Sequence, residues 1–165
     1  MLLKDKVVIV SGIGPGLGIE LALLAASEGA RLAICARTAS KLDDAEQQVA
    51  ALGLGTEVLK VPTDISDRVQ CQALVEQAVA RFGRVDVLIN SAYVGGKFEP
   101  IESADLDDWK ATMDINFFGT MALTQAGICL LYTSDAAGER SCVDIGGSRN
   151  LKKQTIKITM IKKRS

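Results

Sequence analysis

The sequence predicts an α/β fold in which helices cover both faces of a parallel, doubly wound sheet. Three observations predict it: four short apolar runs, helical stretches between them, and a glycine-rich turn within the first 20 residues. Apolar runs without polar alternation are typical of strands buried on both faces, and strands that alternate with helices imply right-handed crossovers. The low aromatic content, 4% of the chain, suits an aliphatic core of this kind.

The elements follow in chain order from these runs and from helix-ending signals. Gly29 and Gly83 stand where a helix gives way to the next strand, and Ser40 and Ser66 are the predicted N-caps. Asp43 and its neighbour Asp44 suit the first turn of the second helix. We expect strands over residues 6–11, 31–36, 57–61 and 85–90, and helices over 16–28, 40–52, 66–82 and from 105 or 106 through 127.

The charge changes sign near residue 128, where the periodic pattern also ends. Residues 1–128 carry a net charge of −6 and residues 129–165 carry +5. We therefore expect an incomplete nucleotide-binding domain over 1–128 and a separate, artefactual or disordered tail over 129–165. The segment CLLYTSDAAGERSCVDIGG resembles a translated sequencing adapter. A divergent C-terminus and a basic nucleic-acid-binding tail are the alternatives, and the lack of stacking aromatics in the last fourteen residues disfavours the latter.

Composition excludes several classes of function. The net charge of −1 gives no reason to expect nucleic acid as a partner, and no apolar run reaches the roughly 18–20 residues of a membrane span. The chain has no histidine, and its four cysteines show no Cys-x-x-Cys spacing, so no metal site and no histidine-based triad are expected. The first residues form a strand rather than a signal peptide, which together with reduced thiols predicts a cytoplasmic protein.

Residues 11–18, S-G-I-G-P-G-L-G, lie between the first strand and the first helix. A phosphate at this place needs backbone N–H groups and the positive end of a helix dipole, and Gly12, Gly16 and Gly18 leave room for that approach. The alternative is an ordinary tight turn. Because no Gly-Lys-Ser/Thr follows, the pattern favours a dinucleotide over the triphosphate of a P-loop protein.

The residue after the second strand distinguishes between two dinucleotides. A carboxylate there would accept a hydrogen bond from a ribose 2′-hydroxyl, whereas this strand ends at Ala36 and is followed by Arg37. A guanidinium can pair with a 2′-phosphate through two hydrogen bonds. The sequence therefore favours NADP(H) over NAD(H), and the alternative is an exposed arginine without a ligand.

Four segments resemble motifs of the classical short-chain dehydrogenase/reductase family. Residues 11–18 resemble TGxxxGxG, 63–66 the signature after the third strand, 88–93 LVNNAG, and 116–124 NxxGxxxxT. They stand in the family's order and cover about residues 1–128. Ser91 and Tyr93 depart from the second Asn and the Gly of NNAG. The resemblance implies a Rossmann-type sheet, truncated here after the fourth strand and the following helix.

The family resemblance also implies an NAD(P)-dependent oxidoreductase that transfers hydride between nicotinamide and a small alcohol or carbonyl substrate. It places Asp64 beside the adenine, uses the Ile65 amide to hold that base, and gives Asn116 a catalytic role behind a proton-relay water. Full-length members are expected to be homo-oligomers, whereas this chain is not expected to assemble natively. The implied cofactor-binding residues are Ser11, Gly12, Gly16, Leu17, Gly18, Arg37, Asp64, Ile65 and Asn90.

The family's catalytic tyrosine and lysine, four residues apart on one helix, have no counterpart in the expected place, and its serine is missing as well. Tyr93 and Lys97 have the spacing, but two glycines between them favour a loop, and the pair precedes the segment that contains Asn116. Tyr132 is followed at that spacing by Ala136. The sequence therefore predicts an inactive chain, and a non-catalytic dinucleotide-binding module is the alternative.

Overall fold

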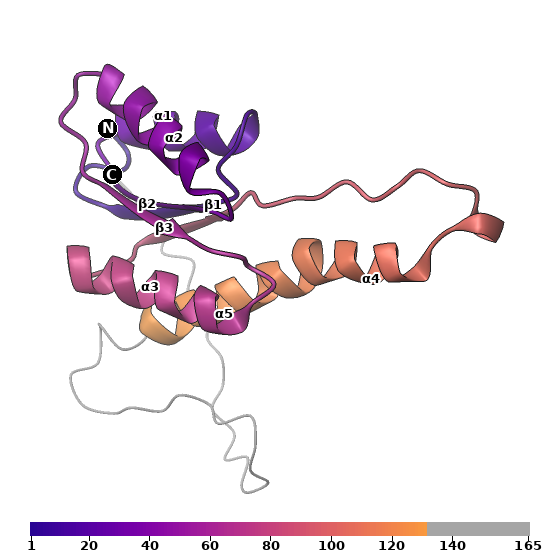
Figure 1. Cartoon of the computed structure of the whole chain (residues 1–165). Coiled ribbons are helices and arrows are strands. Elements are labelled where there is room, and N and C mark those ends of the chain that lie inside the picture. Colours follow the sequence, from indigo (N-terminus) through magenta and orange to yellow (C-terminus); the bar gives the residue numbers. More distant parts are fainter. Residues whose placement is uncertain (132–165) are drawn as a thin grey trace, which may run out of the picture.

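The computed structural model describes residues 1–131 and contains one parallel sheet (Figure 1). Its strands are β1 (Val7–Ser11), β2 (Arg31–Ala36), β3 (Val58–Pro62) and β4 (Val87–Asn90), in the order β3-β2-β1-β4. All three pairings are parallel. The predicted α/β fold is thus confirmed, and each predicted strand end lies within two residues of the observed one.

Helices cover both faces of this sheet, as Figure 1 shows. On one face lie α1 (Leu17–Ser27) and α2 (Ala39–Ala51), and on the other lie α3 (Arg68–Phe82) and α5 (Thr120–Leu131). Between β4 and α5 the chain forms the short 3₁₀-helix η1 (Ile101–Ser103), α4 (Leu106–Met113) and the π-helix η2 (Asp114–Gly119). The predicted tail over residues 129–165 lies outside the described residues from residue 132 onward.

The core has two halves, one on each face of the central strand β1. Val8 and Val10 point toward α1 and α2, while Val7 and Ile9 point toward α3 and α5. All five residues of β1 are fully buried, because the strand is covered on both faces and paired on both edges. The apolar run that predicted a doubly covered strand therefore has its expected physical origin.

Two predicted helix caps were wrong. The N-cap of α2 is Thr38 rather than Ser40, so Asp43 and its neighbour fall outside the first turn, which holds no acidic residue. The N-cap of α3 is Asp67, whose carboxylate accepts hydrogen bonds from two backbone N–H groups of the first turn. Ser66, the predicted cap, instead donates to Asp64 Oδ1 at 2.7 Å. At both starts a residue within two positions of the predicted cap has the extended backbone that capping requires.

The long helix predicted to end at residue 127 is divided by the π-helix η2. Its start is as predicted, with Asp105 as the N-cap of α4 and its carboxylate accepting from Asp107 N at 2.9 Å. Within η2, Gly119 packs so closely on Ile65 that a β-carbon would lie 2.9 Å from the Ile65 carbonyl oxygen. The helix thus widens where it contacts the segment after β3.

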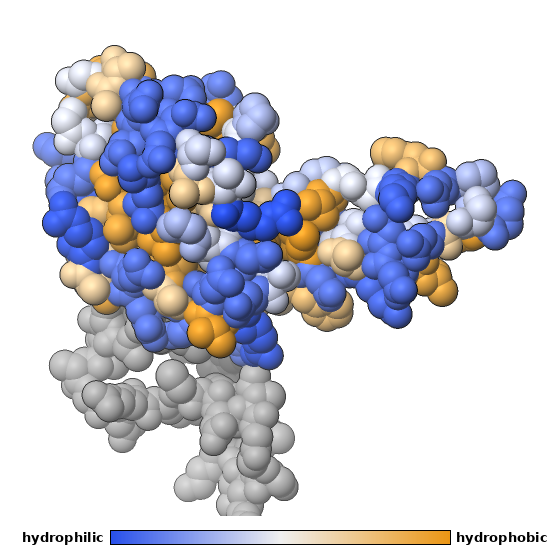
Figure 2. Space-filling view, in the orientation of Figure 1, coloured by the Kyte–Doolittle hydropathy of each residue, from blue (hydrophilic) through white to orange (hydrophobic). Residues whose placement is uncertain are grey.

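Apolar side chains remain exposed at the edge of the sheet and along the helical arm, the projecting part of the chain that contains η1, α4 and η2. Figure 2 shows them as orange patches on the projecting arm. Within the described residues β4 pairs only with β1, and its three apolar residues are half-buried. The exposed large apolar residues from α4 to α5 are Leu106, Trp109, Met113, Phe117, Phe118, Met121 and Ile128.

Asp86 joins the beginnings of β1 and β4. Its Oδ2 accepts a hydrogen bond from Val7 N at 2.9 Å, and its own N–H donates to the Val7 carbonyl at 2.9 Å. Oδ1 pairs with Lys6 at 3.4 Å and with Arg84. Partial burial acts to raise the pKa of this carboxyl, but the bond from Val7 and the two cations outweigh it and hold the pKa below its ordinary value.

We expect Asp86→Asn to lower the free energy of unfolding at pH 7 by about 1–2 kcal/mol, because a charge-assisted bond becomes a neutral one. Urea denaturation measures this. The folded-state pKa is depressed, so the contribution is present above the unfolded-state value of about 3.9. It is lost as the pH falls through the folded-state pKa, and the difference between the two proteins should close there.

Glu57→Gln is the matched control for Asp86→Asn. Glu57 forms an exposed ion pair with Arg81 at 3.2 Å, and such pairs contribute at most about 1 kcal/mol. A difference between the Asp86 variant and the unmodified chain that stays constant down to strongly acidic pH would contradict the assigned role of the carboxylate.

Gly12 holds the turn after β1 against the loop after β4. Its φ is +82°, and a β-carbon would lie 2.3 Å from both the backbone N and Cα of Ala92. Gly14, two residues later, has no such restriction, and a β-carbon there would meet only the Lys41 Nζ at 4.0 Å. A side chain at Gly12 would therefore lower the free energy of unfolding more than a side chain at Gly14.

Gly12→Ala should lower the free energy of unfolding by at least about 2 kcal/mol, since the backbone is strained and the loops must separate. Gly14→Ala should change it by less than about 1 kcal/mol. Urea denaturation of the two variants, followed by far-ultraviolet circular dichroism, gives the comparison. Equal midpoints for the two variants would show that the contact with Ala92 is unimportant.

Candidate functional site

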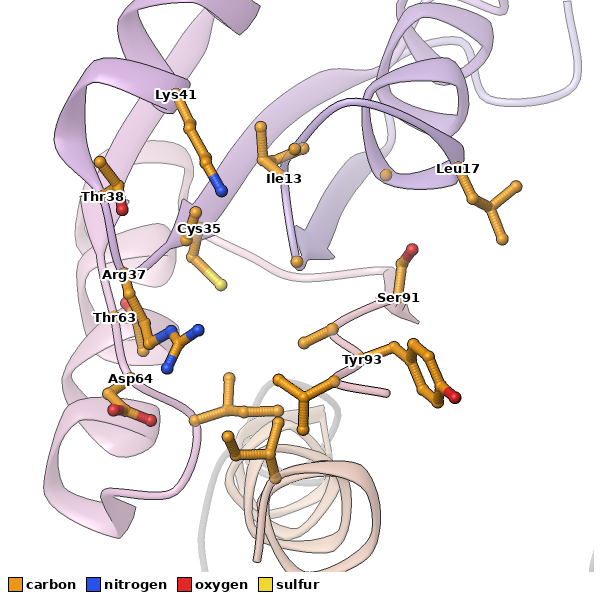
Figure 3. Close-up of a pocket in the computed structure, with 18 of the residues that line it drawn as sticks. Ile13, Leu17, Cys35, Arg37, Thr38, Lys41, Thr63, Asp64, Ser91 and Tyr93 are labelled. Atoms are coloured by element: carbon orange, nitrogen blue, oxygen red, sulfur yellow. The ribbon is translucent and has the colours of Figure 1, made fainter. Parts of the chain in front are cut away.

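A cavity of about 520 Å³ opens at the carboxyl ends of the strands (Figure 3). The chain runs outward from β1 through β2 to β3 and then returns to the other side of β1 as β4. The cavity lies where this reversal occurs, which is the place where open parallel sheets bind ligands. Its wall is formed by the turn after β1, the start of α2, the segment after β3, the loop after β4, and Ile115.

The glycine turn is fixed from behind by β2. The backbone N–H groups of Gly12 and Ile13 both donate to the Cys35 carbonyl, at 2.9 and 3.0 Å. Gly18 brings α1 close, since a β-carbon there would lie 2.2 Å from the Gly12 carbonyl oxygen. The three glycines that the sequence predicted to be required thus lie in one compact turn at the amino end of α1.

The amino end of α1 has the chemistry of an anion site. Gly16 is its N-cap, has φ +123°, and supplies no side chain to cap the first turn. A β-carbon at Gly16 would meet nothing within 4 Å, so this backbone faces open space. Uncapped N–H groups at a helix start bind phosphate groups. The residues of the turn therefore fit a dinucleotide phosphate.

Six of the predicted cofactor residues line the cavity. Figure 3 shows Arg37 at the end of β2 pointing into it, with Asp64 beside it from the segment after β3. The ends of these strands are adjacent because Ala36 pairs with Pro62. The six residues are Gly12, Leu17, Gly18, Arg37, Asp64 and Ile65.

The remaining predicted cofactor residues, Ser11, Gly16 and Asn90, do not line the cavity. Ser11 is fully buried at the end of β1, and its hydroxyl has no hydrogen-bond partner among the described residues. The Asn90 amide at the end of β4 donates to Thr124 Oγ1 at 3.1 Å. Gly16 caps α1 as described above. Ser11 and Asn90 thus belong to the sheet, and the hydrogen bond of Asn90 connects β4 to α5.

Asn116, the predicted catalytic residue, holds the loop after β4. Its side-chain Oδ1 accepts from Val94 N at 2.9 Å, and its Nδ2 donates to the Val94 carbonyl at 2.8 Å. Val94 lines the cavity, whereas Asn116 does not. In this structure the carboxamide acts as a two-point clamp between η2 and the loop. Its place behind a relay water stays a prediction.

Tyr93 and Lys97 lie in a loop, which confirms the prediction that they do not share a helix face. Residues 91–100 contain no helix or strand. Tyr93 is 74% exposed, and its ring points away from the centre of the cavity in Figure 3. The Lys97 backbone N–H donates to Asp108 Oδ2 at 3.2 Å, on α4. The pair is therefore part of a loop that runs toward the helical arm.

Sequence reasoning missed several residues of the cavity wall, of which Thr38 and Lys41 carry useful chemistry. Both belong to the start of α2, which the misplaced cap obscured. A lysine in the first turn is unfavourable for the helix dipole, and this was a signal that the sequence contained. The other missed wall residues are Ile13, Gly14, Pro15, Cys35, Ala36, Thr63, Ser91, Ala92, Tyr93, Val94 and Ile115.

Cys35 places a thiol in the wall of the cavity. Burial raises the pKa of Cys35 to about 12, and burial likewise raises the pKa of Cys71 to about 11. Burial thus disfavours the thiolate of both side chains, which is the nucleophilic form of cysteine.

Residues 1–131 contain no cluster of three or more candidate metal-ligating side chains. Among these residues there is also no helix with the length and apolar character of a membrane span.

The chain matches known oxidoreductases over most of its length. It is 30% identical over 157 residues to an uncharacterised oxidoreductase of Staphylococcus aureus strain USA300, covering 94% of this chain and 65% of that protein. The fold superimposes on a metagenomic short-chain oxidoreductase in complex with NADP with a TM-score of 0.74, at 28% identity, covering 81% of this chain and 60% of that one.

A second solved structure, NAD⁺-bound xylitol dehydrogenase, has a TM-score of 0.77 at 27% identity, covering 82% of this chain and 51% of that one. The chain thus spans between half and two thirds of the length of these relatives. The sequence model for short chain dehydrogenases matches residues 6–140, so the match extends past the boundary predicted near residue 128. On that match, and on a fold and cavity that agree with it, the chain belongs to the short chain dehydrogenase family.

Proposed function

We propose that this chain is the cofactor-binding part of an NAD(P)-dependent oxidoreductase that acts on a small alcohol or carbonyl compound. The observation that carries the proposal is the cavity at the sheet's reversal point, lined by the glycine turn and by Arg37. When bound, the nicotinamide cofactor would supply or accept the hydride. The family match supports this class of reaction.

The residues of the cavity divide the binding task. The amino end of α1 is suited to the phosphates, since its first N–H groups have no side-chain cap. Asp64 and the backbone at Ile65 lie at the end of β3, where the resemblance expects the adenine. Asp64 is itself oriented, because its Oδ1 accepts hydrogen bonds from the N–H and the hydroxyl of Ser66 at 3.0 and 2.7 Å.

Arg37 supports NADP(H) as the preferred cofactor. It follows the end of β2 directly, where a ribose 2′-substituent would lie, and a guanidinium pairs with a phosphate through two hydrogen bonds. The solved structures include one with NADP and one with NAD⁺, so the preference has to come from this chain's own residues. A positive side chain at this position favours the phosphorylated cofactor.

Arg37→Asp should reverse this preference. The variant loses the pairing with the 2′-phosphate and adds repulsion, while a carboxylate can accept hydrogen bonds from an unmodified ribose. We expect NADPH binding to weaken at least about tenfold, with NADH binding unchanged or tighter. Titration calorimetry with both cofactors gives the ratio, and Arg81→Asp on α3 is the control for the same change in charge. An unchanged ratio of the NADPH and NADH affinities would contradict the assignment of Arg37 to the 2′-phosphate.

We further propose that the 165-residue chain does not turn over substrate. Tyr93 and Lys97 lie in a loop, and their side chains are not brought together on a helix. Tyr132 has an alanine at the lysine spacing. A tyrosine needs a nearby cation to lower its pKa enough to exchange a proton near neutral pH.

The purified chain should therefore bind cofactor but show no oxidation of NADPH above background with a panel of small aldehydes and ketones. Absorbance at the reduced-nicotinamide band measures this. The Tyr93→Phe variant is the control for the loop tyrosine and should match the unmodified chain. Carbonyl reduction that depends on the chain and disappears in Tyr93→Phe would overturn the proposal.

A further inference from the structure

Asp64 is held at three of its atoms by the chain that leads into α3. Its backbone N–H donates to Gln70 Oε1 at 2.8 Å, and its carbonyl accepts from Asp67 N at 3.0 Å. Its Oδ1 accepts from the N–H and the hydroxyl of Ser66. Within residues 1–131 the other carboxylate oxygen, Oδ2, accepts no hydrogen bond. Because Asp64 lines the cavity beside Arg37, as Figure 3 shows, that oxygen remains available to a ligand.

The carboxamide of Gln70 has a defined orientation. Its Nε2 donates to Asp67 Oδ2 at 2.9 Å, while Asp67 Oδ1 accepts from the N–H groups of Val69 and Gln70 at 2.8 and 3.3 Å. The bond from the Gln70 side chain is the largest cause that holds the pKa of the Asp67 carboxyl below its ordinary value. A carboxylate only accepts and a backbone N–H only donates, so the amide nitrogen has to face Asp67 and the amide oxygen Asp64.

This arrangement differs from an ordinary capping box. In that motif a glutamine three residues after the N-cap accepts a hydrogen bond from the N–H of the N-cap residue itself. Here the Asp67 N–H donates to the Asp64 carbonyl instead, and the Gln70 oxygen accepts from the Asp64 N–H. The contact made by the glutamine is thereby moved from the helix start to a residue of the cavity wall.

We propose that Gln70 is a positioning residue for adenine recognition, which fixes Asp64 so that Oδ2 can accept a hydrogen bond from the 6-amino group of the base. The inference rests on the proposed function and adds to it a residue that does not itself line the cavity. Without the Gln70 carboxamide, the Asp64 N–H exchanges a fixed acceptor for water, and the carboxylate loses its fixed direction. Selectivity for the amino group then falls, rather than nucleotide affinity as a whole.

The test compares 5′-AMP with purine riboside 5′-monophosphate, which lacks only the 6-amino group. Titration calorimetry with the full chain should show that the unmodified protein binds 5′-AMP about tenfold more tightly, or by about 1.4 kcal/mol. Gln70→Met keeps the length of the side chain and removes both polar atoms. It should reduce the ratio of the two affinities below about threefold, with the purine riboside monophosphate bound within about twofold of the unmodified chain. Asp67 keeps its backbone bonds in this variant, so α3 retains its cap.

Two further variants distinguish positioning from a merely structural role. Gln72→Met removes the same carboxamide from the same helix, where its Nε2 donates to Glu76 Oε1 at 3.0 Å, and should keep the tenfold ratio. Asp67→Asn combined with Gln70→Glu exchanges donor and acceptor between the two side chains. The new amide then donates to the new carboxylate, which still accepts from Asp64 N, and asparagine caps a helix as well as aspartate does. This double variant should regain most of the ratio that Gln70→Met loses.

The outcomes separate this inference from the proposed function. An unchanged ratio in Gln70→Met, or equal weakening of both ligands, would overturn the inference alone, as would a double variant that regains nothing. If the unmodified chain binds the two ligands equally, the amino group is not recognised by Asp64, and the inference fails while nucleotide binding stands. If the unmodified chain binds neither ligand, the proposed function fails as well.

Discussion

The close approach of Gly12 to the backbone of Ala92 is the contact on which the rest of the cavity depends. It brings the end of β1 against the loop after β4 with no side chain between them. Two further bonds complete the junction, from Gly12 N to the Cys35 carbonyl and from Ser91 N to the Ser11 carbonyl. The ends of three strands are therefore held at one point. Both walls of the cavity begin there, so its shape follows from the packing of backbone on backbone.

Much of the fold and of the cavity wall could be predicted from the sequence, because the signals that specify them are local. A continuous apolar run specifies a doubly covered strand, and the glycines between the first strand and helix specify a turn that approaches a phosphate. Gly12, Gly18 and Arg37 lie in the cavity wall because each is fixed by its distance along the chain from a strand end. The loop nature of Tyr93 and Lys97 was also readable, since two adjacent glycines disfavour a helix there.

The features that sequence missed depend on contacts between distant segments. The π-helix forms where Gly119 meets Ile65, a pairing that no local pattern contains. The cap of α2 shifted to Thr38 because the chain leaves β2 in an extended conformation and turns earlier than Ser40. The ion pairs of Lys60 in β3 with Asp43 and Glu46 in α2 likewise join segments that are separate in the sequence. Such choices are made by the folded structure, and propensity alone does not rank them.

The π-helix also sets the phase between two halves of one long helix. A π-turn contains one more residue than an α-turn, so it rotates everything after it by about 100° relative to an uninterrupted α-helix. Asn116 lies inside η2 and grips the loop at Val94, while Leu123 lies beyond it and packs in the core beneath the sheet. An uninterrupted α-helix would aim only one of these side chains correctly. The extra residue therefore lets one continuous helix contact the loop after β4 through Asn116 and the core through Leu123.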